Sequence, residues 1–330
     1  MTRPDVWDTV EGMSRTSDEF RFSAGLHVSV RCPAKINLHL RVGPARSDGF
    51  HPLLTWMCTV GLFDMLDMQL GSSAEPTASR ISLRCDDPNL PVDERNLVVR
   101  IVDAWVKEHV GSAARRIDAT LSKRTPMGAG LGGGSSDAAC ALLAVAKLWG
   151  VASEPAVAKD LSAFAARFGS DIPFFFAAPS AVCSGRGEIV RPIAVPAAKA
   201  ALLVLPPIVM PTPAVYRKFD EMKLGRVLDV EEEPDWHKWS KLPAAELMRE
   251  LVNDLEPPAM ALRPDLEDLR GRIGKIVGRT VRMSGSGSSL FTLFDTMAEA
   301  ENAKQRVREE LKDDAVRLEA VEVGPPIVVE

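Results

Sequence analysis

The 330-residue sequence contains no uninterrupted apolar run that approaches the roughly 18 residues needed to span a bilayer. Its longest apolar stretches are broken early, one by Lys147 and another by Pro206 and Pro207. Residues 1–20 mix charged and polar side chains and lack the apolar segment of a secretory signal. These absences predict a protein of the cytoplasm that has no membrane partner. They also predict that residues 1–24 form a polar and mobile extension.

An excess of basic residues is also missing, because 40 Lys and Arg stand against 45 Asp and Glu, a net charge of −5. A surface that binds a nucleic-acid polymer needs a clustered excess of Lys and Arg, so such a polymer is not an expected partner. The five cysteines are scattered, with neither a CxxC pair nor a Cys/His ligand spacing. The absence of these spacings argues against a zinc site, and the odd number of scattered cysteines favours a reducing compartment.

The patterns of apolar residues predict a mixture of strands and helices. Alternating or β-branched runs predict strands at residues 26–42 (with a bend at Cys32-Pro33), 65–70, 81–85, 117–122, 201–205, 280–283, 290–294 and 316–323. Helical periodicity with capping residues predicts helices at residues 97–110, 138–149, 155–168, 243–255, 262–276 and 297–312. We expect Asn96 to cap the first helix, Ser136 or Asp137 the second and Ser153 the third.

A proline-rich passage predicts the division of the chain into two domains. Residues 191–213 contain six prolines around one apolar strand. Helices and strands interleave without a strict βαβα repeat, so the predicted class is α+β with domains at residues 25–190 and 191–330. The acidic stretch at residues 231–236 is expected to be a surface loop.

The most informative feature is a glycine-rich turn, in which five glycines fall within residues 128–134. It follows a predicted strand and opens a predicted helix, so its N–H groups and the helix dipole can converge on an anion. The hydroxyls of Ser135 and Ser136 can bind phosphate oxygens or Mg²⁺. The turn lacks the lysine of a Walker loop and the acidic residue of a dinucleotide fold. A flexible linker or a tight turn is the alternative, but the flanking strand and helix favour a phosphate cradle.

Four other places permit both a structural and a chemical interpretation. Lys35 and Asn37 share one face of a strand, either as an edge-strand solubility device or as site residues. The turn at residues 48–51 is either an exposed hairpin tip or a place where an aromatic ring meets an imidazole. Asp171 is either a helix cap or a general base, and caps are commoner. The turn at residues 284–287 is either a hairpin loop or part of a site.

Together and in this order, these blocks resemble the GHMP kinase superfamily, most closely its kinases for 4-diphosphocytidyl-2-C-methyl-D-erythritol in non-mevalonate isoprenoid synthesis. The triple glycine is the most specific block, because sister kinases have a shorter turn there. The blocks read PAKINL at 33–38, DGFH at 48–51, GLGGGSSDAA at 130–139, GSDIP at 169–173 and SGSG at 284–287.

The resemblance implies a GHMP kinase N-terminal domain of the ribosomal protein S5 domain 2 type, a ferredoxin-like C-terminal domain and a cleft between them. It implies ATP and Mg²⁺ as cofactors, and transfer of a phosphoryl group to the C2 hydroxyl of the acceptor. Asp171 would be the base, and Lys35 would keep it ionised and stabilise the attacking oxygen. Phosphoryl transfer relies more on positioning and charge stabilisation than on proton abstraction.

The resemblance also implies which residues bind each ligand. ATP would contact Pro126, Met127, Gly128, Ala129, Gly130, Leu131, Gly132, Gly133, Gly134, Ser135, Ser136, Gly285, Ser286 and Gly287, with Ser135 or Ser136 near Mg²⁺. The acceptor or nucleotide would contact Asn37, Phe50, His51, Asn96, Lys123, Thr212 and Tyr216. His51 would read the cytosine edge by hydrogen bonds, and Phe50 and Tyr216 would stack on the base. The family usually has Tyr at the position of Phe50, so a hydroxyl is lost there.

Two other functions remain open. The chain could be another small-molecule kinase of the superfamily, acting on mevalonate, homoserine or a sugar. It could instead be a non-catalytic nucleotide-binding protein on the same scaffold, although Lys35 and Asp171 are both present. In either case the expected partner is a small molecule, and the expected assembly is a monomer or a weak homodimer.

Overall fold

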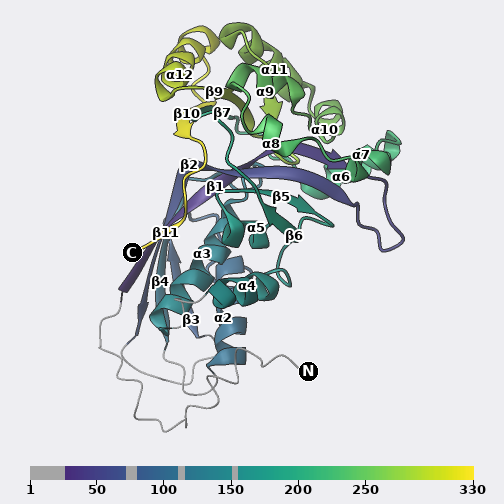
Figure 1. The fold of residues 1–330 in the computed structure, drawn as a ribbon. Helices are drawn as coiled ribbons and strands as arrows, with labels where there is room; N and C mark the ends of the chain where they lie inside the picture. The colour runs from purple at the N-terminus through teal and green to yellow at the C-terminus, as the bar shows by residue number, and fades with distance from the viewer. Residues whose placement is uncertain (1–26, 72–79, 111–115, 151–154) are drawn as a thin grey trace.

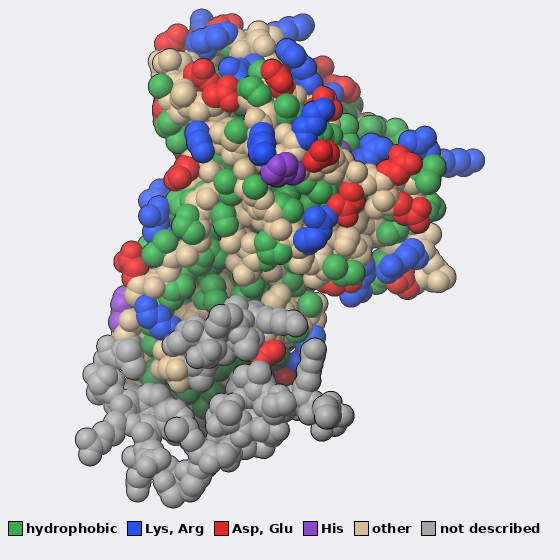
Figure 2. Space-filling view, viewed as in Figure 1, with side chains coloured by type: hydrophobic (Ala, Val, Ile, Leu, Met, Phe, Trp, Pro, Cys, Tyr) green, Lys and Arg blue, Asp and Glu red, His purple; other side chains and the backbone are tan. Residues whose placement is uncertain are grey.

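The computed structural model describes residues 27–71, 80–110, 116–150 and 155–330 (Figure 1). The predicted extension at residues 1–24 and the predicted cap Ser153 lie outside the described residues. None of the helices within these ranges is long and apolar enough to cross a membrane. Acidic and basic side chains are interspersed over the face of the molecule that Figure 2 shows.

The larger sheet is built around two long antiparallel strands, β1 (His27–Val42) and β2 (Leu53–Leu70). Within the described ranges it has seven strands, with the order β11-β1-β2-β4-β3; β5 also pairs with β2, and β6 pairs with β5. The pairing of β1 with β2 shifts in register at Pro33/Ala34 and again between Asn37 and His39. The other strands are β3 (Ile81–Cys85), β4 (Ile117–Ser122), β5 (Ser180–Ser184), β6 (Ile189–Pro192) and β11 (Val328–Val329).

Helices cover one face of this sheet. They are α2 (Leu97–His109), α3 (Gly133–Leu148), α4 (Pro155–Ala165) and α5 (Ile172–Ala177). The central helix α3 consists largely of small, fully buried residues and packs against β1 and β2. Because alanines bring helix and sheet backbones close together, the glycine-rich turn at the start of α3 lies directly beside β1.

The smaller sheet has the order β10-β7-β9-β8. Its strands are β7 (Ala200–Leu205), β8 (Arg282–Met283), β9 (Leu290–Phe294) and β10 (Arg317–Glu322). The helices of this half are α6 (Thr212–Glu221), α7 (Leu228–Glu231), α8 (Trp236–Trp239), α9 (Ala244–Glu250), α10 (Glu256–Leu262), α11 (Pro264–Val277) and α12 (Met297–Leu311).

Strand β7 is buried on both faces and joins the two halves of the molecule. Ala200, Leu202 and Val204 pack into the core beneath α6, α10, α11 and α12. Ala201 and Leu203 belong to a second cluster that includes apolar residues of β1 and β2. Figure 1 accordingly shows β1 and β2 running between the lower helices α2 to α5 and the upper helices α10 to α12. The molecule is an α+β protein, as the sequence predicts.

Several predicted elements are confirmed, and others are wrong. The helix predicted at residues 243–255 ends at Glu250, and residues 251–255 are not helical. Strands β3, β4 and β9 and helix α2, with Asn96 as its cap, have the predicted places. Helix α3 begins at Gly133 instead of Ala138, because Gly132 has a φ of 66° and ends the turn earlier. Ser136 and Asp137 therefore lie inside the helix and do not cap it.

The stretch at residues 231–236 contains the predicted surface loop over residues 232–235, but its last residue does not lie on the surface. It connects α7 to α8, and its Trp236 is buried among aromatic rings 5.9 Å from Trp56 and 5.6 Å from His39, measured between ring centroids. Burial of this large ring stabilises the fold, and the acidic residues before it remain exposed to water. The boundary predicted at residue 191 remains a prediction, because the chain returns to the larger sheet through β11.

Candidate active site

A buried lysine faces a half-exposed carboxylate at the centre of the molecule. Lys35 of β1 has a side chain that is only 4% exposed, and its Nζ lies 3.2 Å from Oδ2 of Asp171. The same Nζ donates to Oδ1 of Asn37 at 2.5 Å. Asp171 precedes α5, yet within the described chain its carboxylate accepts no capping bond from that helix. Its carboxylate therefore pairs with Lys35 while 40% of the side chain stays open to solvent.

The free edge of β1 is covered by two glycine-rich turns. β11 pairs with β1 only at Val30 and Arg31, so the edge further along the strand is open to other partners. The N–H of Lys35 donates to the Leu131 carbonyl at 2.9 Å, and the N–H of Asn37 donates to Oγ of Ser284 at 3.1 Å. Lys35 and Asn37 are therefore not solubility residues of an exposed edge.

The glycines of the first turn permit close approach to Lys35 and to the second turn. Gly128, Gly130 and Gly132 have φ values between 63° and 77°. A Cβ at Gly132 would lie 2.8 Å from Cγ of Lys35, and one at Gly130 would overlap the Ser284 carbonyl oxygen. Oγ of Ser284 also donates to the Gly130 carbonyl at 2.8 Å. The two turns therefore form one unit against β1.

A cavity of about 470 Å³ opens beside the first turn. Every residue from Pro126 to Ser135 lines it, together with Asn96, Leu97 and Lys123. Ser136 does not line it but is fully buried, and its Oγ has no hydrogen-bond partner among the described residues. Residues 285–287 are not part of the cavity wall and reach it only through their contact with the first turn.

Lys123 is held by two buried carboxylates below the turn. Its Nζ donates to Asp64 at 2.5 Å and to Asp137 at 2.6 Å. The second oxygen of Asp64 accepts the N–H groups of Arg124 and Thr125 at 2.5 and 2.8 Å. Burial raises the pKa of Asp137 to about 7, although the charge of Lys123 opposes this shift. Burial lowers the pKa of Lys123, but the two carboxylates together raise it above its ordinary value.

The cavity lining does not include Phe50, His51 or Tyr216, which form a separate group. His51 is buried, with Nδ1 2.9 Å from the Gly43 carbonyl and its ring centroid 5.1 Å from that of Tyr216. Because a carbonyl only accepts, Nδ1 must carry the proton. Burial raises the pKa of Tyr216 to about 12, and the charge of Asp171 adds to the shift. Phe50 is exposed, and the Arg186 guanidinium lies 4.8 Å from its ring centroid.

The remaining predicted contacts have structural partners. Asn96 caps α2 by accepting the N–H of Val98 at 2.9 Å, and its amide donates to the Pro91 carbonyl at 2.8 Å. Thr212 Oγ1 lies 2.8 Å from Oγ of Ser286, which links α6 to the second turn. Asn37 donates to Oγ1 of Thr55 at 2.9 Å.

Sequence reasoning missed three polar residues that organise this region. Asp64 and Thr55 lie within β2, where no motif distinguishes them from other strand residues. Asp220 lies in α6, with its Oδ1 3.4 Å from Nε2 of His51. Its position four residues after Tyr216 is the only signal that could have pointed to it, since residues four apart share one helix face.

Known family models match both halves of the chain. The family model of the GHMP kinases N terminal domain matches residues 96–178, and that of the GHMP kinases C terminal matches residues 241–313. The chain is 35% identical over 319 residues to the 4-diphosphocytidyl-2-C-methyl-D-erythritol kinase of Synechococcus sp. (strain CC9605), covering 89% of this chain and 100% of that protein. It is 35% identical over 292 residues to the chloroplastic enzyme of that name from Mentha piperita, covering 86% of this chain and 68% of that protein.

Solved structures show the same fold. The crystal structure of a 4-(cytidine 5'-diphospho)-2C-methyl-D-erythritol kinase aligns with a TM-score of 0.70 and 33% identity, over 90% of this chain and 99% of that chain. A homoserine kinase from Cytophaga hutchinsonii aligns with a TM-score of 0.65 and 18% identity, over 93% of this chain and 98% of that chain. At 18% identity, the second likeness concerns the fold alone.

Proposed function

The chain belongs to the 4-diphosphocytidyl-2-C-methyl-D-erythritol kinases of the GHMP kinase family, and from this premise we propose that it transfers a phosphoryl group from ATP to the C2 hydroxyl of that acceptor. The observation that supports this proposal most is the ion pair of Lys35 and Asp171, 3.2 Å apart and directly beside the glycine-rich turn. A base next to a phosphate cradle is the arrangement that phosphoryl transfer to an alcohol requires.

Asp171 is proposed to accept the proton of the C2 hydroxyl. Its carboxylate is 40% exposed, so an acceptor can reach it, while the buried ammonium of Lys35 holds it in place. A second donor of that ammonium bonds to Oδ1 of Asn37, which fixes the lysine against β1. Lys35 can then offset the negative charge that develops on the attacking oxygen.

Residues 126–136 are proposed to bind the phosphates of ATP, with Gly285, Ser286 and Gly287 covering them. The unpaired N–H groups at the start of α3 and its dipole favour a bound anion. Mg²⁺ would be held by the phosphates together with the hydroxyl of Ser135 or Ser136. This assignment fits, because Ser135 lines the cavity and the buried Oγ of Ser136 lacks a partner among the described residues. The ion would supply positive charge to the transferring phosphoryl group.

The cytidine is proposed to lie at Phe50, His51 and Tyr216. Burial and the Gly43 carbonyl fix the imidazole, so its recognition groups are oriented before the ligand arrives. Phe50 offers a ring face without the hydroxyl that is usual in the family. Asn37 and Thr212 are proposed to contact the acceptor, and Asn96 and Lys123 the nucleotide in the cavity.

We infer further that the protein works in the cytoplasm as a monomer or weak homodimer, without a nucleic-acid or membrane partner. All five cysteines are free thiols, and four of them are buried, which suits a reducing compartment.

A panel of acceptors tests the function. ATP consumption is measured with 4-diphosphocytidyl-2-C-methyl-D-erythritol, mevalonate, homoserine and a sugar, with Asp171→Asn as the control. The expected result is turnover of the cytidine-linked acceptor alone, inhibited by free cytidine nucleotides. Turnover of another acceptor without such inhibition would assign a sister activity. Tight ATP binding without any turnover would assign a non-catalytic role.

A further inference from the structure

Residues 252–254 continue the set of segments that bind the free edge of β1. The N–H of Leu40 donates to the Val252 carbonyl at 2.8 Å, and the N–H of Asp254 donates to the Leu40 carbonyl at 2.9 Å. Along this edge, β1 therefore meets the first turn at Lys35, the second turn at Asn37 and then residues 252–254 at Leu40. The register shift between Asn37 and His39 permits this change of bonding residue.

Asn253, the middle residue of this segment, binds the second turn directly. Its side chain is buried, with a relative exposure of 5%. The amide nitrogen donates to the carbonyls of Met283 and Gly285, each at 2.8 Å, and Oδ1 accepts the N–H of Leu255 at 2.9 Å. Both amide hydrogens are therefore used on the two carbonyls that flank Ser284.

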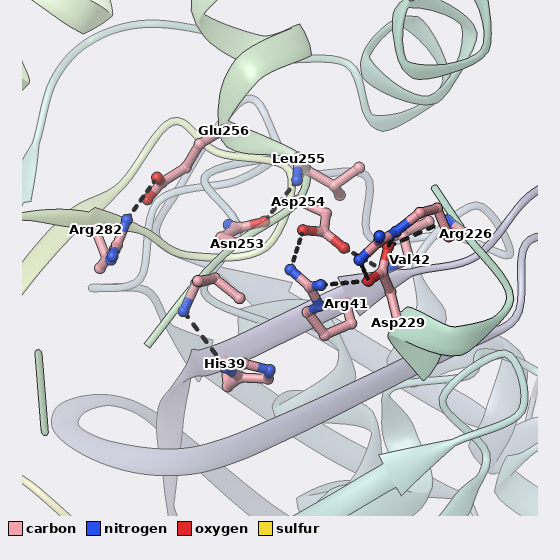
Figure 3. Close-up of polar contacts among 11 residues, drawn as sticks. His39, Arg41, Val42, Arg226, Asp229, Asn253, Asp254, Leu255, Glu256 and Arg282 are labelled. Carbon is pink, nitrogen blue, oxygen red and sulfur yellow. Dashed lines mark hydrogen bonds and ion pairs between the residues drawn. The ribbon is translucent and has the colours of Figure 1, made fainter. Parts of the chain in front are cut away.

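The neighbours of Asn253 hold the segment from both sides, as Figure 3 shows. The carboxylate of Asp254 accepts hydrogen bonds from the guanidinium of Arg41 and from the N–H of Val42, each at 3.0 Å. Glu256 accepts the N–H of Met283 at 2.8 Å and also pairs with Arg282. The amide of Asn253 thus lies in a frame tied to β1 on one side and to β8 on the other.

We propose that Asn253 is a positioning residue for ATP binding. Its amide holds the turn at residues 284–287 in the position beside β1 from which this turn covers the phosphates. The inference rests on the proposed function for the role of that turn. Ser284 bridges Asn37 and the Gly130 carbonyl, so the turn touches both the strand of the candidate lysine and the phosphate cradle. Without the two donors of Asn253, the carbonyls of Met283 and Gly285 lose these hydrogen bonds, and the turn is held against Gly130 less firmly, by the bonds of Ser284 and its neighbours alone.

Substitution at Asn253 and binding of a non-hydrolysable ATP analogue test the proposal. Asn253→Asp keeps the shape and the acceptor for Leu255 but removes both donors, and Asn253→Ala removes the whole amide. We expect a loss of analogue affinity of about tenfold or more in both variants, with affinity for the cytidine-linked acceptor within about twofold of the wild type. Asn302→Asp, the same chemical change at an exposed position of α12, is the matched control and should bind like the wild type.

Melting temperatures are measured beside the affinities, since a purely structural role would lower stability and leave the affinity of the folded protein unchanged. Wild-type analogue affinity in both variants would overturn the proposal, as would an equal loss of affinity for the acceptor.

If both variants fail to fold, Asn253→Ser decides. This variant keeps one donor and should bind the analogue with intermediate affinity, and wild-type affinity would refute the role. A wild-type protein that binds the analogue but phosphorylates no acceptor would refute the proposed function alone, because the affinities still test Asn253.

Discussion

The buried group of Lys123, Asp64 and Asp137 permits a quantitative prediction for Lys123→Met. The side chains are 7%, 0% and 4% exposed, and one ammonium serves both carboxylates. Removing the cation leaves two buried carboxylates without a counter-charge, a change that costs about 3–5 kcal/mol. At the roughly 2–4 °C per kcal/mol of a large domain, the melting temperature should fall by roughly 6–20 °C.

The size of this loss should depend on pH. Without Lys123 no cation opposes the effect of burial on Asp137, so this carboxylate binds a proton more readily in the folded variant than in the unfolded chain, and the stability of the variant falls as the pH rises. Burial already raises the pKa of Asp137 to about 7 with Lys123 present. The difference from the wild type should therefore be largest near pH 8 and shrink toward pH 5.

Thermal unfolding of Lys123→Met at a series of pH values measures both effects. Lys147→Met is the matched control, since that exposed lysine bonds only to the Val329 carbonyl within the described chain, and it should cost less than about 1 kcal/mol. A second change, Asp137→Asn, should restore part of the stability of Lys123→Met. A loss below about 1 kcal/mol at pH 8, or one that does not change with pH, would refute the reasoning.

Three further predictions follow from the geometry of the site. His51→Ala should raise the KM for the acceptor and leave the KM for ATP near its wild-type value, because the ring packs near Tyr216 and does not line the cavity. Steady-state kinetics with each substrate varied in turn measure both values, and a change confined to the KM for ATP would contradict the prediction. Gly132→Ala should destabilise the protein by about 1–3 kcal/mol, because the φ of Gly132 is 66° and the new Cβ would lie 2.8 Å from Cγ of Lys35. Denaturant unfolding measures this loss, and unchanged stability would contradict the close approach. In the wild type, the raised pKa of Asp137 gives a contribution to stability that is complete below the ordinary pKa near 4 and is lost as the pH rises through about 7. Asp137→Asn should therefore flatten the pH dependence of the melting temperature in this range, and an unaltered profile would contradict the assignment.

Local patterns in the sequence were sufficient for the elements whose signals lie within a few residues. Helix α2 was predictable because Asn96 caps it and its apolar residues recur at helical spacing. Strands β3 and β4 were predictable from alternating apolar residues. The start of α3 was misplaced because the positive φ of Gly132, which decides where the helix begins, depends on the packing of that residue against Lys35.

The sequence supplied candidate residues for the site but could not show which of them lie together in the fold. Motif resemblance pointed to Lys35 and Asp171, and spacing alone could not distinguish a base from a helix cap. The structure shows that the carboxylate makes no capping bond within the described chain and instead pairs with the ammonium of Lys35, 136 positions earlier; its role as the base stays a proposal. Asn253 had no signal in the sequence, since its role depends on Leu40 and on the turn at residues 284–287, which meet it only in the folded protein.

The most direct test of the account is a single-turnover measurement of phosphoryl transfer from ATP to 4-diphosphocytidyl-2-C-methyl-D-erythritol, with the product identified by phosphorus NMR. The account predicts one phosphate monoester at C2 in the wild type. It predicts a rate at least about 100-fold lower in Asp171→Asn, with ATP affinity nearly unchanged. A variant as fast as the wild type, or a phosphate at another position, would contradict the assignment of Asp171 as the base.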